Sequence, residues 1–151
     1  MSGDLIIGPS LKTIDNSAFY NCSSLDNIIV ENINAAYSMS VFEGCNAVLT
    51  VPCSFVNKGR LNNHYNGYRC ETIKTLIIKP DKDTVVRSDS AKPNGVPNLT
   101  HIKLCSGMEY INGNSIGRVS DYLQILELPD TFNISHSNEL NTLYLGNKSL
   151  Q

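Results

Sequence analysis

AFYNCSSL (residues 18–25) and VFEGCNAV (residues 41–48) are two copies of one motif in this 151-residue chain, offset by 23 residues. Each copy places a phenylalanine three residues before a cysteine. When the sequence is shifted by 23, apolar residues also coincide outside the motif: Leu5 falls on Ile28, Ile7 on Val30 and Ile14 on Tyr37. The intervals between these positions are unequal, so no single helical or strand period explains them, and the chain is a repeat.

A second pattern, apolar-x-x-apolar-x-apolar, extends the repeat along the chain. Its last two apolar positions alternate with variable ones, which is typical of a half-buried strand. Pro80, Pro129 and Gly146 follow three of the copies and are expected to end those strands. The copies are Leu25/Ile28/Val30, Ile73/Leu76/Ile78, Leu99/Ile102/Leu104, Leu123/Leu126/Leu128 and Leu140/Leu143/Leu145.

A unit of about 23 residues cannot bury its apolar side alone, but stacked units can bury it against one another. The sequence therefore predicts a solenoid, with short parallel β-strands on one face and irregular or short helical returns on the other. Equivalent strands would lie about 4.8 Å apart. Phe19 and Phe42 should stack as one interior ladder, and Cys22 and Cys45 as another, because a buried cysteine behaves as a small hydrophobe.

The composition excludes several classes of protein. The net charge is −2 and charged residues make up 17 %, so we expect no nucleic-acid partner. No apolar run is long enough to cross a membrane, and we expect no membrane insertion. No signal peptide is visible, and the strand-like start suggests a fragment of a longer chain. The 18 asparagines indicate many turns.

The cysteines and histidines form no zinc-binding spacing. The odd number of cysteines, five, argues against a complete disulfide framework. A bond between Cys53 and Cys70 stays open at this point.

Residues 16–25, with Ile28 and Val30 after them, resemble the BspA-type leucine-rich repeat. Ile14 and Leu25 also fall on apolar positions of that family's pattern, while Asp15 replaces its usual glycine. The stretch that begins LTVPCSF at residue 49 is similar to the segment that closes a run of such repeats. A short helix is expected there, with Ser54 as its cap and Gly59 weakening it.

The resemblance is specific over residues 5–73, generic over 99–145 and absent over 79–98. It implies a leucine-rich-repeat solenoid from a cell-surface or secreted protein associated with adhesion. We expect one solenoid fragment over residues 1–151, in which 1–74 are BspA-type repeats with their closing segment and 75–151 are degenerate repeats. Polar residues 81–98 are expected to form a long, mobile loop, and an interdomain linker is the alternative.

Few residues in the sequence point to catalysis. His64 is expected on a helix surface, and His136 lies between two serines, where adjacent side chains rarely face each other productively. Asp81 and Asp83 are too few for a calcium loop. The sequence therefore predicts no enzyme, no catalytic residue, no cofactor and no metal, and a small hydrolase is the least favoured alternative.

The outward positions of the predicted strands remain as the candidate site. They carry Thr75 and Ile77 on one strand and then the candidate residues of a protein-binding face, which are His101, Lys103, Ile125, Glu127, Thr142 and Tyr144. Asp26, Asn27 and Ile29 would extend this face. The predicted partner is a protein, such as a host extracellular or microbial surface protein, with a glycan less favoured. The alternative function is a structural spacer with no ligand.

Overall fold

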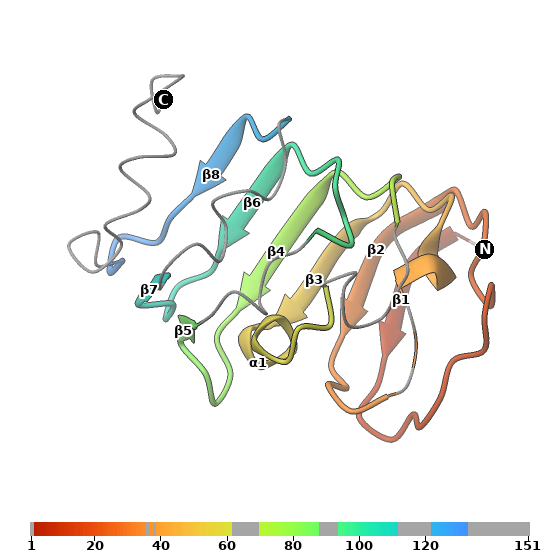
Figure 1. Cartoon of the computed structure of the whole chain (residues 1–151), viewed down its shortest axis with the longest axis horizontal. Coiled ribbons are helices and arrows are strands. Elements are labelled where there is room, and N and C mark those ends of the chain that lie inside the picture. Colours follow the sequence, from red (N-terminus) through yellow and green to blue (C-terminus); the bar gives the residue numbers. More distant parts are fainter. Residues whose placement is uncertain are drawn as a thin grey trace.

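The computed structural model describes residues 2–35, 37, 39–61, 70–87, 94–111 and 122–132. Six parallel strands form one sheet in the order β1-β2-β3-β4-β6-β8, and two further strands pair in a small sheet, β5-β7 (Figure 1). The elements are β1 (Ser2–Ile7), β2 (Ser24–Val30), η1 (Met39–Phe42), β3 (Val48–Pro52), α1 (Cys53–Asn57), β4 (Thr75–Lys79), β5 (Val85–Val86), β6 (His101–Leu104), β7 (Tyr110–Ile111) and β8 (Ile125–Glu127).

The pairing register confirms the repeat that the sequence predicts. Leu5 pairs with Ile28 and Ile7 pairs with Val30, so these β1 and β2 positions coincide after a shift of 23 residues. Every neighbouring pair in the large sheet is parallel, and each strand is one turn further along the chain. The chain is therefore a solenoid. The expected strand around Leu143 and Leu145 lies outside the described residues.

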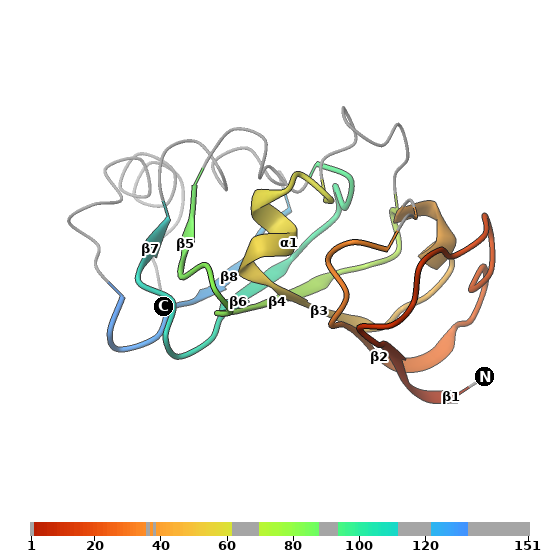
Figure 2. The ribbon, with the colours of Figure 1, turned by 90° about the horizontal axis from the view of Figure 1, so that it is seen from below.

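Two layers make up the solenoid (Figure 2). The large sheet forms one layer, and η1, α1 and the irregular returns form the other. The apolar residues of each strand point between them, because side chains alternate across a strand. The first inward row comprises Leu5, Ile28, Leu49, Leu76, Ile102 and Leu126, and the second comprises Ile7, Val30, Val51, Ile78 and Leu104.

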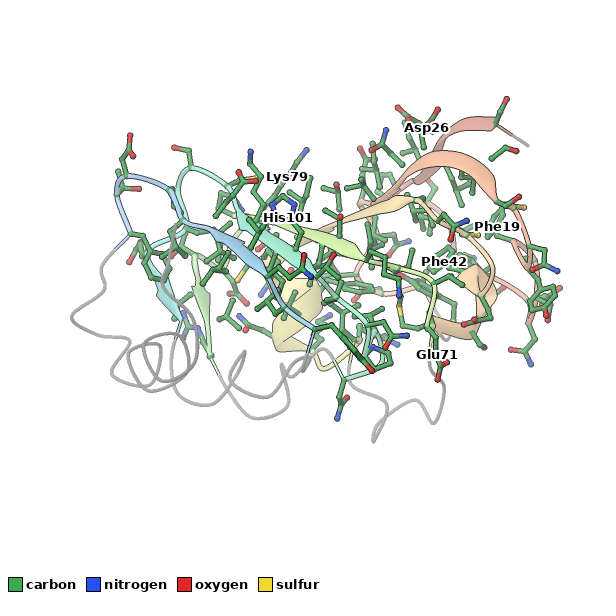
Figure 3. The ribbon with its side chains drawn as sticks, turned by 90° about the horizontal axis from the view of Figure 1, so that it is seen from above. Phe19, Asp26, Phe42, Glu71, Lys79 and His101 are labelled. Carbon is green, nitrogen blue, oxygen red and sulfur yellow. The ribbon has the colours of Figure 1, made fainter. Side chains whose placement is uncertain are left out.

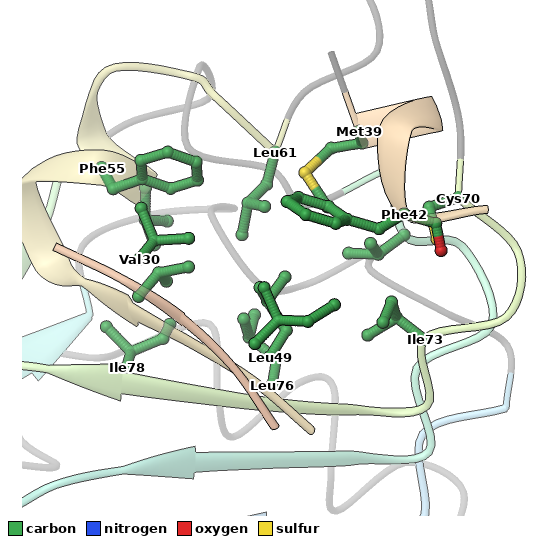
Figure 4. Packing of buried hydrophobic residues seen from close by; sticks show 14 of the residues in the cluster. Val30, Met39, Phe42, Leu49, Phe55, Leu61, Cys70, Ile73, Leu76 and Ile78 are labelled. Carbon is green, nitrogen blue, oxygen red and sulfur yellow. The ribbon is translucent and has the colours of Figure 1, made fainter. Parts of the chain in front are cut away.

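Aromatic side chains from the returns close the core against these rows. The rings of Phe42 and Phe55 are fully buried between the two layers, where Figure 4 shows them above Leu49 and Leu76. Tyr37 contacts both rings, edge-on to Phe42 at a centroid distance of 5.9 Å and stacked on Phe55 at 6.0 Å. Successive turns are thus joined by aromatic contacts as well as by the sheet.

The repeated phenylalanine and cysteine also share hydrogen bonds. Within a turn, the amide of the cysteine donates to the phenylalanine carbonyl, from Cys22 to Phe19 (3.2 Å) and from Cys45 to Phe42 (2.9 Å). Between turns, the thiol of Cys45 donates to the Phe19 carbonyl (3.0 Å), and the thiol of Cys70 donates to the Phe42 carbonyl (3.5 Å). A cysteine at this position therefore links two turns. All five cysteines are free, so Cys53 and Cys70 are not bridged.

The helix after β3 forms where the closing segment was expected, but the prediction that Ser54 caps it is wrong. Pro52 is the N-cap residue and makes no side-chain capping bond. Ser54 lies inside the first turn, where its hydroxyl and its amide both donate to the carboxylate of Asp81 from the next turn. Gly59, with φ of +70°, follows the helix rather than interrupting it.

Residues 81–87 are tied to α1, whereas the sequence suggested a polar loop over 81–98. The Asn57 amide donates to the Val85 carbonyl (2.9 Å) and to the Asp83 carboxylate (3.0 Å), and its oxygen accepts from the Arg87 amide (2.9 Å). Val85 then pairs with Tyr110, which begins the second sheet. This part of the polar segment is a return of the solenoid with its own strand.

Candidate protein-binding face

The candidate face is the outward side of the large sheet. Residues between the buried positions of each strand point away from the core, and Figure 3 shows Asp26, Lys79 and His101 there, opposite Glu71. No described return or helix covers this side of the sheet (Figure 2). The face is therefore open to solvent over the described strands.

The parallel register lines up the outward side chains into two ladders. Because each strand is in register with its neighbours, equivalent positions lie about 4.8 Å apart across the sheet. The first ladder is Asp4, Asn27, Val48, Thr75, His101 and Ile125, and the second is Ile6, Ile29, Thr50, Ile77, Lys103 and Glu127.

Three of the predicted site residues meet at one end of these ladders. The Glu127 carboxylate lies between the two basic side chains, with Oε2 3.0 Å from the Lys103 Nζ and Oε1 2.6 Å from the His101 Nε2. The Nε2 atom lies close to the Glu127 carboxylate but makes no well-aligned hydrogen bond among the described residues. The cluster joins β6 to β8 through side chains on the exposed face.

The ion pair shifts the pKa of both of its members. Hydrogen bonding and the nearby charge of Glu127 raise the pKa of Lys103, and hydrogen bonding from Lys103 lowers the pKa of Glu127, with His101 adding to that effect. Both groups are solvent-exposed, so the pair contributes little to the free energy of folding. Its geometry instead fixes the orientation of a positive and a negative group side by side.

Ile125 completes the described part of the predicted site. It pairs with His101 in register and leaves 49 % of its surface exposed. Thr142 and Tyr144, the other two predicted members, lie outside the described residues. The structure therefore brings together four of the six predicted residues around the last two described strands.

The other end of the face carries charged and apolar groups that were not predicted from the sequence. Asp4 and Ile6 on β1 point outward, and Ile6 is 58 % exposed. Glu31 and Lys79, which follow the last buried position of β2 and β4, are also exposed on this side. The 23-residue shift that aligns Leu5 with Ile28 could have placed Asp4 and Ile6 on the face.

Two shallow hollows lie at the carboxyl ends of the strands. One, of about 300 Å³, is bordered by Ile29, Thr50, Pro52, Glu31 and Lys79, among others. The second, of about 460 Å³, includes Lys103 and Glu127 in its lining. Both are open depressions at this edge of the sheet rather than enclosed cavities.

The described residues contain no group of three or more metal-ligating side chains. In the same ranges, no helix combines the length and apolar character needed to span a membrane. His64 and His136 lie outside the described residues, so the structure does not describe the surroundings of either.

Comparison with known proteins places this architecture in a family. The BspA type leucine rich repeat region matches residues 3–118 in six copies. The chain belongs to the BspA-type leucine-rich repeat family. No curated protein and no solved structure matches the chain.

The match of the BspA-type repeat reaches further than the sequence motifs indicated. It covers β6, where the resemblance was only generic, and residues 79–98, where no resemblance was recognised. A BspA-type solenoid is a repeat scaffold of a kind that typically serves protein interaction and not catalysis. The exposed strand face is the part of this scaffold that its own turns leave unoccupied.

Proposed function

We propose that this chain is a non-catalytic protein-binding module of an adhesive surface or secreted protein, and that it binds through the outward face of its sheet. The observation that carries the proposal is the cluster of His101, Lys103 and Glu127 beside the exposed Ile125. Membership of the BspA-type family supports the surface location and the adhesive role.

The chemistry of the face favours a protein partner. Its second ladder carries Ile6, Ile29 and Ile77 and then an oriented Lys–Glu pair, so apolar area lies next to charges of both signs. Interfaces between proteins combine an apolar centre with polar groups at the rim. A host extracellular protein or a microbial surface protein offers such a surface, whereas a glycan would leave the isoleucines without apolar contacts.

Binding to a panel of purified extracellular-matrix proteins, measured by biolayer interferometry, tests the proposal. The wild-type chain should bind at least one of them saturably. Lys103→Ala, Glu127→Ala and Ile125→Ala should each weaken that binding by about tenfold, because they lie at the centre of the cluster. Their melting temperatures should stay close to that of the wild type, since these side chains are exposed.

Lys12→Ala is the matched control, because Lys12 is exposed on the return after β1 and not on the sheet face. Its binding should equal that of the wild type. The spacer alternative predicts no saturable binding to any protein. Equal losses of affinity in Lys12→Ala and Lys103→Ala would show that the partner does not bind at the strand face.

A further inference from the structure

The charges on the strand face are segregated along the solenoid axis. The first two turns present the acidic side chains of Asp4, Asp26 and Glu31. The fourth and fifth turns present the basic side chains of Lys79 and Lys103, with His101 beside them. The third turn lies between these two regions. Over the first five turns, acidic groups thus lie toward one end of the face and basic groups toward the other, and Glu127 on the sixth strand lies beside Lys103 and His101.

The third turn, at the middle, carries no charge on this face. Its outward residues are Val48, Thr50 and Pro52 on β3. Thr50 is nearly buried between Ile29 and Ile77, with which it is in register on either side. The centre of the face is therefore an apolar strip with a small side chain in its middle, bordered by the 300 Å³ hollow.

This arrangement is self-complementary. A two-fold axis parallel to β3 reverses the order of the turns and keeps positions along the strands unchanged. Turn two of one copy then faces turn four of the other, and turn one faces turn five. Ile29 would meet Ile77 of the second copy. Glu31 would meet Lys79, because both lie at the same level as Pro52.

We propose that a second copy of the same chain binds the first five turns of this face. The two copies would lie face to face about an axis along β3. The proposal rests on the proposed function insofar as it uses the same binding face. Two-fold contacts between identical chains require such a self-complementary patch. Asp4 would face His101 of the second copy, and the stem of Lys103 would cover Ile6.

Glu31 and Lys79 are free to make this contact. No hydrogen bond or ion pair within the described residues engages either side chain. Both border the same hollow, but two strand spacings, about 10 Å, separate them, so they do not pair directly within one chain. An opposite charge on a facing copy would satisfy each of them.

The size of the face sets the expected affinity. Five strands, each with about five residues on the contact, present roughly 400 Å² per copy in projection. This area is below the standard size of a stable protein interface, so we expect a weak dimer with a Kd of about 10–100 µM. Because its rim is ionic, raising the salt from about 50 to 500 mM should weaken it further.

Sedimentation velocity of the whole 151-residue chain over about 5–500 µM tests the proposal, together with two charge reversals. Glu31→Lys and Lys79→Glu should each raise the Kd by about tenfold or more. Residue 31 of each copy faces residue 79 of the other, so either change creates two pairs of like charges in the dimer. An equimolar mixture of the two variants should associate again, since every facing pair then has opposite signs.

Asp15→Lys and Lys12→Glu are the matched controls, because they make the same charge changes on the return after β1. They should dimerise like the wild type. A wild-type chain that stays monomeric at every concentration overturns the proposal, as does a dimer that ignores both reversals. Retained binding to a matrix protein in either case would leave the proposed function standing, because that assay needs no second copy.

Discussion

Phe19 and Phe42 lie one turn apart with their rings stacked, at a centroid distance of 6.1 Å and an interplanar angle of 14°. The two residues occupy the same position in successive repeats, yet their burial differs. Phe42 is fully buried, whereas Phe19 is only partly buried at the edge of the core. The reason is that Phe42 has described turns on both sides of it, and Phe19 has one on one side only.

This difference predicts unequal effects of truncation. Phe42→Ala should lower the free energy of unfolding by about 3–5 kcal/mol, as expected for a buried aromatic side chain. Phe19→Ala removes a ring that is only partly buried, so it should lower the free energy of unfolding by less, about 1–3 kcal/mol. Urea unfolding followed by circular dichroism measures both. Equal losses would mean that the first turn is covered as completely as the second.

The sheet could be predicted from the sequence because the 23-residue shift sets both the strands and their register. Leu5, Ile28 and Ile102 each carry the apolar pattern on their own strand. The second sheet could not be predicted in this way. Val85–Val86 is a two-residue strand in a polar segment, and the side chain of Asn57, distant in sequence, holds it in place.

For the candidate face, alternation along the strands was enough to place His101, Lys103 and Glu127 side by side. It could not reveal that Asp26 is an extra residue in a bulge, because Gly3 pairs with Leu25 and the next residue pairs with Asn27. The segregation of charge was also missed, since it appears only when all turns are aligned on one face.

Tyr37 supplies a second prediction. Its hydroxyl is buried without a hydrogen-bond partner among the described residues, and burial raises its pKa far above the ordinary value for tyrosine. Tyr37→Phe removes this unpaired polar atom and keeps the ring contacts with Phe42 and Phe55. The free energy of unfolding should therefore rise by about 1 kcal/mol. A loss of stability in urea unfolding would show that the hydroxyl has a partner.

The cysteines should react in two groups with a thiol reagent such as DTNB. Cys22 and Cys105 are partly exposed, whereas Cys45, Cys53 and Cys70 are buried. Burial also raises the pKa of Cys45 to about 11 and that of Cys53 to about 12, which suppresses the reactive thiolate. At pH 8 the native chain should therefore show two fast thiols. Unfolding in guanidinium should expose all five, and five fast thiols without denaturant would contradict the burial of Cys45, Cys53 and Cys70.

The same shifts predict a loss of stability at alkaline pH. An unfolded thiol releases its proton near pH 9, but buried Cys45 and Cys53 keep theirs until higher pH. The native state then binds more protons than the unfolded state, so the free energy of unfolding should fall as the pH rises above about 9. Cys45→Ala should show a smaller fall between pH 8 and pH 10. If the free energy of unfolding fell with pH equally steeply in both chains, the raised pKa of Cys45 would be contradicted.

Asn57 supplies the last prediction, because one side chain joins α1 to β5. Asn57→Ala removes its bonds to the Val85 carbonyl, the Asp83 carboxylate and the Arg87 amide. The free energy of unfolding at pH 7 should fall by about 1–3 kcal/mol, since the partly buried bonds to Val85 and Asp83 are lost. Lys58→Ala, a change at the next residue that removes only an exposed bond to Asn34, is the control and should change stability by less than about 0.5 kcal/mol.

The effect of Asn57→Ala should also depend on pH. The hydrogen bond from Asn57 is the main cause that holds the pKa of Asp83 below its ordinary value, with Lys82 and Arg87 adding to it. Because its native pKa is lowered, Asp83 stabilises the fold at pH values above its unfolded pKa. This stabilisation is lost as the pH falls through the native pKa. The stability difference between wild type and Asn57→Ala should therefore shrink between pH 5 and pH 3, as urea unfolding at each pH can measure. A difference that stays constant over that range would mean that Asn57 does not stabilise the charged form of Asp83.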